Sequence, residues 1–426
     1  MNKQVKQILL IVLAVLLIGE LAFLGFRALR GEEPHQPDLP PAAASSPTGE
    51  TMEAFASSAP SEVSATEVSE APTEASTEPK ESRYVLTFTG DCTFGSTAEK
   101  WSNGYGFVKT VGENYDWPFE NLRPYFEADD FTIINLEGPL TDGGTPADKQ
   151  FVFRGLPDYT RIMTGASVEA VTLANNHARD YGQTGYNNTV QALTNSGIAY
   201  VERDGTALYT TESGLTIGLY AASFSFRESS IRAAISGLRE QGAEIVVCAF
   251  HWGDEGTYRP NGSQEYFGRL AIEAGADIVW GHHPHVLQKI ERYGNGVIFY
   301  SLGNCSFGGN TYPKDYDSAI VQQEVIRGSD GTVRLGELTI VPISLSSVSG
   351  RNNYQPTPLQ PDTEAYARVL SKLDGSFRGA DLISAETAPP TQMPTVPAET
   401  GETGVPETAA PEIPTGEIPG STGAES

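Results

Sequence analysis

Short apolar runs alternate with amphipathic stretches through the middle of the chain, from about residue 84 to residue 344. The runs are rich in β-branched and aromatic residues, which predicts buried β-strands. They cover residues 84–89, 131–135, 170–173, 215–221, 245–250, 277–280 and 297–301.

Apolar residues with helical spacing lie between several of these runs, at residues 184–195, 229–241 and 263–274. A glycine follows each stretch within two residues, where a helix commonly ends on a left-handed residue. Two later runs, at residues 319–326 and 333–340, flank a Gly-Ser-Asp-Gly sequence that predicts a hairpin. Strands that alternate with helices indicate an α/β fold with the helices outside the sheets.

The two ends of the chain differ in composition from this block. Residues 31–82 and 386–426 are rich in Pro, Ser, Thr, Ala and Glu and have almost no large apolar side chains. Such segments bury too little surface to offset the entropy of ordering, so both are expected to be disordered. The sequence therefore predicts one large domain over residues 83–385, between a linker and a tail.

Much of the net charge of −26 lies in those two segments. Residues 31–82 carry 11 acidic residues against one lysine, and residues 386–426 carry seven acidic residues and no base. The charge is expected mainly to keep the linker and the tail solvated and extended. The acidity that remains argues against a nucleic-acid partner, which would require a basic face.

An apolar run also precedes the linker, within residues 1–30. It covers residues 8–26 and is interrupted only by Glu20; a helix of this length, at about 1.5 Å per residue, nearly spans a hydrocarbon core of about 30 Å. The alternative is a cleaved signal peptide, whose apolar region is usually about 7–15 residues long and ends at small residues. Phe23, Phe26 and Arg27 occupy that place here. We therefore expect an uncleaved signal anchor, that is, a transmembrane helix of a single-pass cell-membrane protein with the bulk of the chain extracytoplasmic.

Polar residues follow the predicted strands at the point where each strand ends. These clusters are Gly90-Asp91, Asn135-Leu136-Glu137, Asn175-Asn176-His177, His251-Trp252-Gly253, His282-His283-Pro284-His285 and Ser301-Leu302-Gly303-Asn304. Ligands of open α/β sheets bind at the carboxyl ends of the strands, so the six clusters are expected to converge on one site. Five of the six histidines of the chain lie in them.

The residue types in these clusters are those of a metal site. His283 and His285 are two residues apart and share one face of an extended segment, so both rings can reach one ion. Imidazole suits Mn, Fe or Zn, and harder oxygen donors come from Asp91, Glu137 and Asn176. This set exceeds the needs of one tetrahedral ion. It predicts one or two divalent ions, and a pair would lie about 3.5–4 Å apart, ionise a water and stabilise a transferring phosphoryl group.

In their order along the chain, the clusters resemble the motifs of the CapA family. That family is named for poly-γ-glutamate capsule synthesis and is related to the calcineurin-like metallophosphatases. The similarity extends from about residue 84 to residue 344 and includes Asp180-Tyr181-Gly182 and Gln288. The resemblance implies a four-layer αββα sandwich of the metallophosphatase-like type, with the site at one rim.

The resemblance also implies roles for single residues. The metal ligands of the family are matched here by Asp91, Asn176, His251, His283 and His285, and Glu137 stands where ordinary phosphatases have a bridging aspartate. His177 matches the histidine that contacts the phosphoryl oxygen. Asp180 is expected either to orient the ring of His177 or to cap the helix that follows.

Substrate contacts are less sharply defined. Arg154 either clamps an anionic substrate or forms a surface ion pair. Glu255 follows the matched His-Trp-Gly motif and Asn304 ends another matched motif, and both are expected to contact the substrate.

The chain departs from the related phosphatases at several positions. Thr93 stands where those enzymes have a histidine, which weakens the case for a second ion. Glu255 is followed by Gly256 rather than by the usual tyrosine of the family, and Cys305 replaces an aromatic residue. These differences bear on metal number and substrate choice. His282 is an alternative ligand to its neighbour in the His-rich loop, although it breaks the two-residue spacing.

Three cysteines leave at least one thiol unpaired. Cys248 lies in an apolar run and is typical of a buried small residue. Cys92 and Cys305 lie in regions that are expected to meet, so a disulfide between them and two free thiols are both open.

Two functions fit these expectations. The first is a metal-dependent phosphoesterase-like hydrolase that acts outside the membrane. The second is a non-catalytic capsule factor that binds or attaches an anionic surface polymer such as poly-γ-glutamate, with polymer-synthesis proteins as further partners. The acidic linker and tail weigh mildly against direct binding of a polyanion, because like charges repel. A structural surface domain with a relict site is a third option, and the intact His-rich motifs disfavour it.

Overall fold

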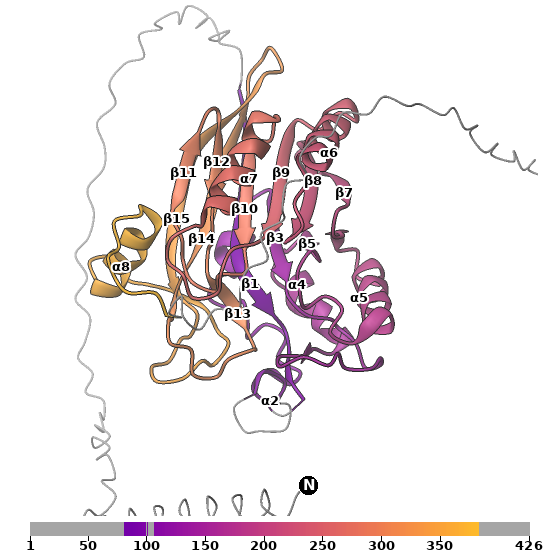
Figure 1. Ribbon diagram of the computed structural model, residues 1–426, viewed down its shortest axis with the longest axis vertical. Helices are drawn as coiled ribbons and strands as arrows, with labels where there is room; N and C mark the ends of the chain where they lie inside the picture. The colour runs from indigo at the N-terminus through magenta and orange to yellow at the C-terminus, as the bar shows by residue number, and fades with distance from the viewer. Residues whose placement is uncertain (1–80, 99, 101–105, 383–426) are drawn as a thin grey trace, which may run out of the picture. The chain divides into compact units, whose positions relative to one another are not determined.

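Two β-sheets form the centre of the computed structural model, which describes residues 81–98, 100 and 106–382 (Figure 1). The first sheet has the strand order β16-β15-β14-β1-β3-β5-β6, and β13 also pairs with β1. Its strands are β1 (Ser82–Thr93), β3 (Phe131–Leu136), β5 (Ala170–Thr172), β6 (Ala199–Val201), β13 (Asn304–Phe307), β14 (Asp317–Arg327), β15 (Val333–Ser344) and β16 (Thr357–Pro358). Strands β1, β3, β5 and β6 are parallel, whereas β14, β15 and β16 add an antiparallel half.

The second sheet has the strand order β11-β12-β10-β9-β8-β7. It consists of β7 (Thr206–Thr210), β8 (Thr216–Ser223), β9 (Ile245–His251), β10 (Ile278–His282), β11 (Ile290–Tyr293) and β12 (Gly296–Phe299). The four central strands are parallel, and the edge strands β7 and β11 are antiparallel to their neighbours. A small separate sheet pairs β2 (Ser96–Thr97) with β4 (Phe153–Arg154).

Helices cover the outer faces, so that the layers run helix, sheet, sheet, helix (Figure 1). The second sheet is covered by α6 (Glu228–Glu240) and α7 (Gly262–Glu273). The first is covered by α2 (Phe107–Val111), α3 (Arg123–Phe126), α4 (Thr160–Thr164) and α5 (Gly182–Asn195), with the 3-10 turn η1 (Pro157–Tyr159). The last helix, α8 (Glu364–Leu373), contacts β14 and β15.

The layered core explains why the strands are apolar along their whole length. Ile133 in β3 points into the core between the sheets, whereas its neighbour Ile134 points into the core under the helices. Strands that are buried on both faces need apolar side chains at successive positions. Trp280 lies in the core between the sheets, and its Nε1 donates a hydrogen bond to the carbonyl oxygen of Thr89 at 2.9 Å. This bond joins the two sheets directly.

The predicted elements are confirmed, with shifts of one to a few residues at their ends. The three predicted helices correspond to α5, α6 and α7, and the predicted hairpin is formed by β14 and β15. The α/β fold with outer helices is also confirmed. Several short elements were not predicted, among them β6, β7, β11 and α8. In β7 exposed and half-buried residues alternate, so an edge strand of this kind has no apolar run to mark it.

Most of the predicted linker and all of the predicted tail lie outside the described residues. β1 begins at Ser82, so this residue belongs to the domain rather than to the linker. The apolar run at residues 8–26 is also outside them, and within the described ranges no helix is long and apolar enough to cross a membrane. The membrane anchor therefore stays a prediction.

Candidate metal centre

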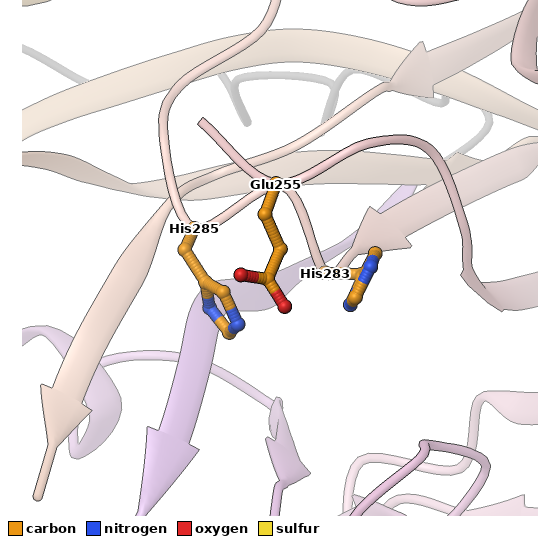
Figure 2. A group of neighbouring side chains, drawn as sticks. All are labelled: Glu255, His283 and His285. Carbon is orange, nitrogen blue, oxygen red and sulfur yellow. The ribbon is translucent and has the colours of Figure 1, made fainter. Parts of the chain in front are cut away.

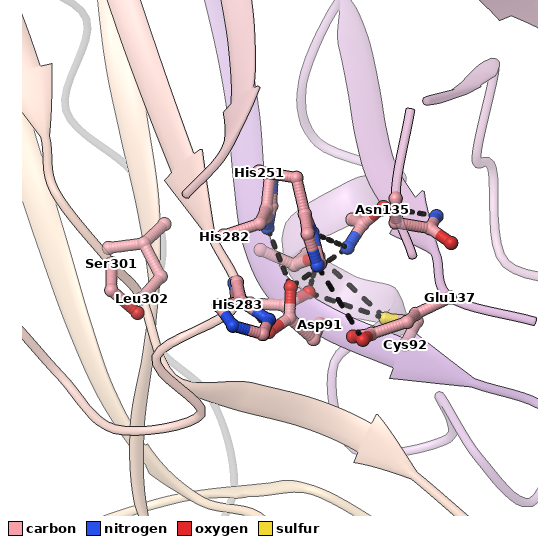
Figure 3. A network of polar contacts seen from close by, with 12 residues as sticks. Asp91, Cys92, Asn135, Glu137, His251, His282, His283, Ser301 and Leu302 are labelled. Atoms are coloured by element: carbon pink, nitrogen blue, oxygen red, sulfur yellow. Dashed lines mark hydrogen bonds and ion pairs between the residues drawn. The ribbon is translucent and has the colours of Figure 1, made fainter. Parts of the chain in front are cut away.

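The strand ends bring the predicted polar clusters of both sheets together (Figure 3). In the first sheet Asp91 on β1 lies beside Asn135 on β3 and Asn304 on β13. In the second sheet His251 and His282 end neighbouring strands, side by side. The convergence follows from parallel pairing, since parallel strands end at the same edge of a sheet.

Asp91 is buried and receives contacts on both carboxylate oxygens. Its Oδ1 lies 2.9 Å from Asn135 Nδ2 and 2.8 Å from His282 Nδ1, and its Oδ2 lies 3.2 Å from the backbone nitrogen of His283 and from Nδ1 of His285. Burial raises the pKa of Asp91, but the hydrogen bonds from His282 and His285 outweigh it and hold that pKa well below its usual range. Asp91 is therefore an ionised carboxylate at neutral pH.

Close backbone approach explains the glycine before Asp91. A Cβ on Gly90 would lie 2.3 Å from the carbonyl oxygen of Gly303, and that same oxygen accepts a hydrogen bond from the backbone of Asp91 at 2.9 Å. The His-rich loop is strained as well, because His283 and His285 have φ values of 96° and 56°. Such conformations cost on the order of 1–3 kcal/mol each and are common at functional sites.

Glu137 follows β3 and is completely buried. Neither of its carboxylate oxygens has a hydrogen-bond partner in the part of the chain that the structure describes. Its Oε1 lies 3.8 Å from Nε2 of both His251 and His285 and 4.0 Å from Nε2 of His177. Burial and the negative charge of Asp91 raise the pKa of Glu137 well above its usual range. A cation among these atoms would satisfy a carboxylate that is otherwise costly to bury.

The histidines around Glu137 differ in protonation. Burial, helped by the neighbouring His283, holds the pKa of His251 well below its ordinary value. Burial and the positive charge of His285 lower the pKa of His283 to about 3. Burial also acts to lower the pKa of His285, but the carboxylates of Glu137 and Asp91 outweigh it and raise that pKa to about 10. His251 and His283 are therefore neutral imidazoles, the form that binds metal ions.

Two overlapping groups of side chains have the spacing of a metal site. Asp91, Glu137 and His285 form one, and Glu255, His283 and His285 form the other; within each group the ligand atoms lie within 4.8 Å of one another. Figure 2 shows the carboxylate of Glu255 between the two histidine rings. The donors fit one or two divalent ions. Glu255 lies among the candidate metal ligands, and its predicted contact with the substrate stays a prediction.

His177 is oriented by Asp180. The two side chains are 2.8 Å apart, Nδ1 to Oδ2, and Asp180 also accepts a hydrogen bond from the backbone of Phe153 at 2.6 Å. Burial lowers the pKa of His177, although Asp180 opposes this effect. The next helix begins at Gly182 and has no side-chain cap. Asp180 therefore orients the ring of His177 and does not cap the helix.

Asn176 faces His251 across the gap between the sheets, with its Oδ1 2.8 Å from His251 Nε2. Behind it, Asn175 Nδ2 donates to Oδ1 of Asn135 at 3.0 Å. Asn135 and Asn175 were not predicted as site residues, although both stand inside the matched motifs. A cavity of about 400 Å³ lies beside Asn176; its lining includes Asn175, Arg179, Tyr186, Glu202 and Arg203.

Three further residues make contacts with other side chains at or beside the centre. Asn304 is buried, and its Oδ1 lies 2.9 Å from Nδ1 of His285, so it orients that ring. His282 contacts Asp91 and packs on Trp280 with ring centroids 4.1 Å apart, behind the ligand groups. Arg154 lies over the ring of Tyr181, 5.1 Å from its centroid. Substrate contacts of Arg154 and Asn304 stay predictions.

Two further residues at the centre have no sequence pattern that marks them. Lys149 forms an ion pair with Asp180 at 2.5 Å and lies 3.3 Å from Nδ1 of His177. Phe224 has a φ of 55°, and its ring centroid lies 4.8 Å from that of His283 and 5.5 Å from that of His251. Lys149 comes from a loop, and Phe224 directly follows β8 (Thr216–Ser223) but is apolar, so neither belongs to the polar clusters.

The thiols of Cys92 and Cys305 are both free and both buried. They lie on the paired strands β1 and β13. The structure therefore has two free thiols here and not a disulfide between Cys92 and Cys305.

Sequence comparison identifies the family. The family model described as bacterial capsule synthesis protein PGA_cap matches residues 85–308, which is more than half of the chain. The chain belongs to the PGA_cap family. The predicted resemblance to CapA proteins is thereby confirmed.

Curated relatives of this PGA_cap chain include two CapA proteins. The capsule biosynthesis protein CapA of Bacillus anthracis is 28% identical over 300 residues, which cover 63% of this chain and 69% of the relative. The PGA biosynthesis protein CapA of Bacillus subtilis is 30% identical over 321 residues, which cover 68% of this chain and 78% of the relative.

The solved structures are more distant. The NAD nucleotidase of Haemophilus influenzae is 11% identical, with a TM-score of 0.36 and coverage of 70% of this chain and 63% of that one. The purple acid phosphatase PPD1 of yellow lupin is 13% identical, with a TM-score of 0.32 and coverage of 72% and 58%. Likenesses of this size carry no argument about activity.

The PGA_cap match contains every candidate ligand of the metal centre. It ends at residue 308, so that β14, β15 and α8 lie beyond it.

Proposed function

We propose that this chain is a CapA-type factor of cell-surface polymer biosynthesis, and that its metal centre is a phosphoesterase-like hydrolytic site. The observation that carries the proposal is the environment of Glu137. Glu137 is a buried carboxylate without a hydrogen-bond partner among the described residues, and three histidine nitrogens lie within 4.0 Å of it, a donor set that fits a divalent metal ion.

The proposed ligands come from both sheets and from the loop after β9. They are Asp91, Glu137, Asn176, His251, Glu255, His283 and His285. One or two ions of Mn, Fe or Zn held there would supply a Lewis acid and an activated water.

The chain's own groups complete the proposed chemistry. His177 presents Nε2 towards the centre, while Asp180 holds its Nδ1. The ring is thus placed to contact a phosphoryl oxygen and to hold or release a proton there. The cavity beside Asn176, which Arg179 and Arg203 also line, has room for the rest of an anionic substrate.

Context comes from the relatives and from the N-terminal sequence. Two relatives are named for capsule or PGA biosynthesis, so an anionic polymer of the cell surface, or the proteins that make it, is the proposed partner. The apolar run at residues 8–26 supports a transmembrane helix that holds the domain outside the cell membrane. The helix–sheet–sheet–helix layering supports a metallophosphatase-like αββα sandwich.

The test uses the purified full chain, stripped with a chelator and reloaded with Mn, Fe or Zn. We expect one or two bound ions per chain and hydrolysis of an aryl phosphate. His251→Ala and His283→Ala should reduce activity by more than the roughly 10–100-fold seen for residues that only support a ligand. His35→Ala is the matched control, because His35 is the one histidine outside the polar clusters. A protein that binds no metal and cleaves no phosphoester would overturn the proposal.

A non-catalytic role in polymer assembly is the second candidate. The names of the relatives favour it, because they refer to biosynthesis, and two mycobacterial relatives, 27% identical, are named probable polyglutamine synthesis accessory proteins. Under this role, deletion of the gene should abolish the surface polymer, while the metal-loaded protein cleaves no phosphoester.

A further inference from the structure

The loop between β9 and α7 carries Glu255 to the metal centre. Two hydrogen bonds hold this loop without involving Glu255. Gln288 Nε2 donates to the carbonyl oxygen of Thr257 at 2.9 Å, and Asn261 Nδ2 donates to Oδ2 of Asp254 at 2.8 Å. The residue itself is exposed, so packing around its side chain does not hold it in place. Contacts of the backbone on either side of Glu255 therefore determine where its carboxylate lies.

Gly256, the next residue, is held from two sides. Its backbone nitrogen donates to the carbonyl oxygen of Pro284, in the His-rich loop, at 2.8 Å. Its carbonyl oxygen accepts a hydrogen bond from the backbone of Leu382 at 2.8 Å. One contact joins the loop to the other metal ligands, and the second joins it to the last described residue of the chain.

Tyr258 makes two further contacts with the C-terminal part and one with Asp315, just before β14. Its backbone nitrogen donates to Oδ1 of Asp381 at 2.9 Å, and its hydroxyl donates to Oδ2 of Asp315 at 2.9 Å. Its ring lies edge-on to Phe377, with centroids 4.9 Å apart. The neighbouring Arg259 pairs with Asp381 at 3.7 Å.

A buried charge cluster fixes the position of the helix that leads to these residues. Nζ of Lys372, on α8, bonds to Asp315 at 2.6 Å and to Asp317 at 2.7 Å, and it lies 4.7 Å from the centroid of the Tyr258 ring. Arg368 adds two hydrogen bonds of 2.7 Å to Asp317. Buried ion pairs tolerate little change in geometry, because a displaced partner leaves a charge without compensation.

We propose that residues 363–382, which we call the C-terminal clamp, are a positioning element of the metal centre: they hold the backbone of Gly256 and Tyr258 and thereby place Glu255 beside His283 and His285. The inference rests on the proposed function, since it requires that the centre binds metal. The clamp lies outside the PGA_cap match, so it adds a part to the site that the shared motifs do not contain.

Deletion of the clamp would not test this idea. Val369 and Leu373 belong to the hydrophobic core, so their loss would unfold the domain whatever the role of the loop. The informative variants change only the contacts with the loop. Asp381→Ala removes the acceptor for the backbone of Tyr258 and the partner of Arg259. Tyr258→Phe removes the hydroxyl bond to Asp315, the carboxylate through which Lys372 of the clamp is linked to the loop.

The test combines these changes in the full chain and measures Mn²⁺ stoichiometry and affinity by titration, with elemental analysis. We expect the Asp381→Ala, Tyr258→Phe double variant to bind one Mn²⁺ at least about tenfold more weakly. Loss of a residue that orients a metal ligand usually lowers metal affinity by about 10–100-fold. Glu255→Gln should cause a similar loss. Adding the double variant to Glu255→Gln should cause no further loss, because both changes act through the same side chain.

Glu364→Ala is the matched control, since Glu364 is an exposed acidic residue of the clamp, on α8, for which no contact with the loop is seen. Thermal unfolding in chelator checks that the variants remain folded. Wild-type Mn²⁺ binding in the double variant, or losses that add to those of Glu255→Gln, would overturn the clamp and leave the proposed function intact. A wild-type chain that binds none of Mn, Fe and Zn and cleaves no phosphoester would overturn both.

Discussion

At the scale of single residues, the metal centre places two carboxylates close together in a buried site. Asp91 is satisfied by hydrogen bonds from histidines, whereas Glu137 has none from the described residues. The pKa of Glu137 is raised because burial and the charge of Asp91 both oppose its ionisation. Such a carboxylate lowers the free energy of unfolding when no cation is bound, and it is the kind of group that a cation site requires.

The substitution Glu137→Gln tests that balance. Without metal, we expect it to raise the free energy of unfolding by about 1–3 kcal/mol, because the unfolded carboxyl group ionises readily, the buried one does so only at a cost, and glutamine removes that difference. A carboxyl group whose pKa is raised by folding stabilises the protein at low pH, and this contribution is lost as pH rises through the folded-state pKa. The gain from glutamine should therefore be larger at pH 8 than at pH 5.

The measurement is chemical denaturation in chelator at both pH values, followed by thermal unfolding with added Mn²⁺. The increase in melting temperature on adding Mn²⁺ should be smaller in the variant than in the wild type. A variant that is less stable without metal would show that Glu137 has a structural partner.

At the scale of elements, the opposite ends of the same strands carry a second pair of carboxylates. Asp129 precedes β3 and accepts a hydrogen bond from Thr132 Oγ1 at 2.6 Å, and Glu169 precedes β5 and accepts one from the backbone of Thr132 at 2.7 Å. Burial raises the pKa of both to about 7. Their titration therefore affects the pairing of β3 with β5 and not the metal centre, which lies at the carboxyl ends of these strands.

Asp129→Asn should change how stability depends on pH. The wild-type contribution of Asp129 is present below its unfolded pKa and is lost as pH rises through about 7, since folding raises this pKa. Asparagine keeps the oxygen that Thr132 bonds and has no charge. We expect little change in the free energy of unfolding at pH 4.5 and a gain at pH 8, as measured by denaturant titration with metal removed.

Asp142→Asn is a suitable control, because Asp142 is exposed. Equal effects of Asp129→Asn at the two pH values would contradict the interpretation.

At the scale of the whole domain, each sheet supplies half of the centre. Asp91, Glu137 and His177 lie on or after strands of the first sheet. His251, His283 and His285 lie on or after strands of the second. The distances between ligands therefore depend on how the sheets pack. Trp280 joins the two sheets close to the centre, because it donates a hydrogen bond to the carbonyl oxygen of Thr89, two residues before Asp91.

Trp280→Phe should therefore weaken both stability and metal binding. We expect a loss of about 2–3 kcal/mol in the free energy of unfolding, from the smaller ring and the carbonyl oxygen that loses its donor. Mn²⁺ affinity should fall as well, because Asp91 is no longer held at its distance from the second sheet. Denaturation in chelator and Mn²⁺ titration measure the two effects.

Trp117→Phe is the matched control, since Trp117 Nε1 also donates to one backbone oxygen, that of Asn353, at 2.8 Å. It should lower stability and leave Mn²⁺ affinity unchanged. If both tryptophan variants bind Mn²⁺ like the wild type, packing between the sheets does not set the geometry of the centre.

The sequence alone was enough to predict most of the central strands, the three long outer helices and the convergence of the histidines. The physical reason is that strands buried on both faces must be apolar throughout, and that the ends of parallel strands must meet. Asp91, Glu137, His251, His283 and His285 are all strand-end residues of this kind, and the structure brings all five together.

Only the tertiary structure decided what the loops and the chain's last helix contribute. Glu255 lies with the metal ligands, Asp180 orients His177, Lys149 joins that pair, and Asn304 orients His285. None of these contacts follows a period of two or of 3.6 residues, because each depends on where a loop turns after its strand ends. The same holds for the C-terminal clamp, whose contacts with the Glu255 loop join residues more than 100 positions apart in the sequence.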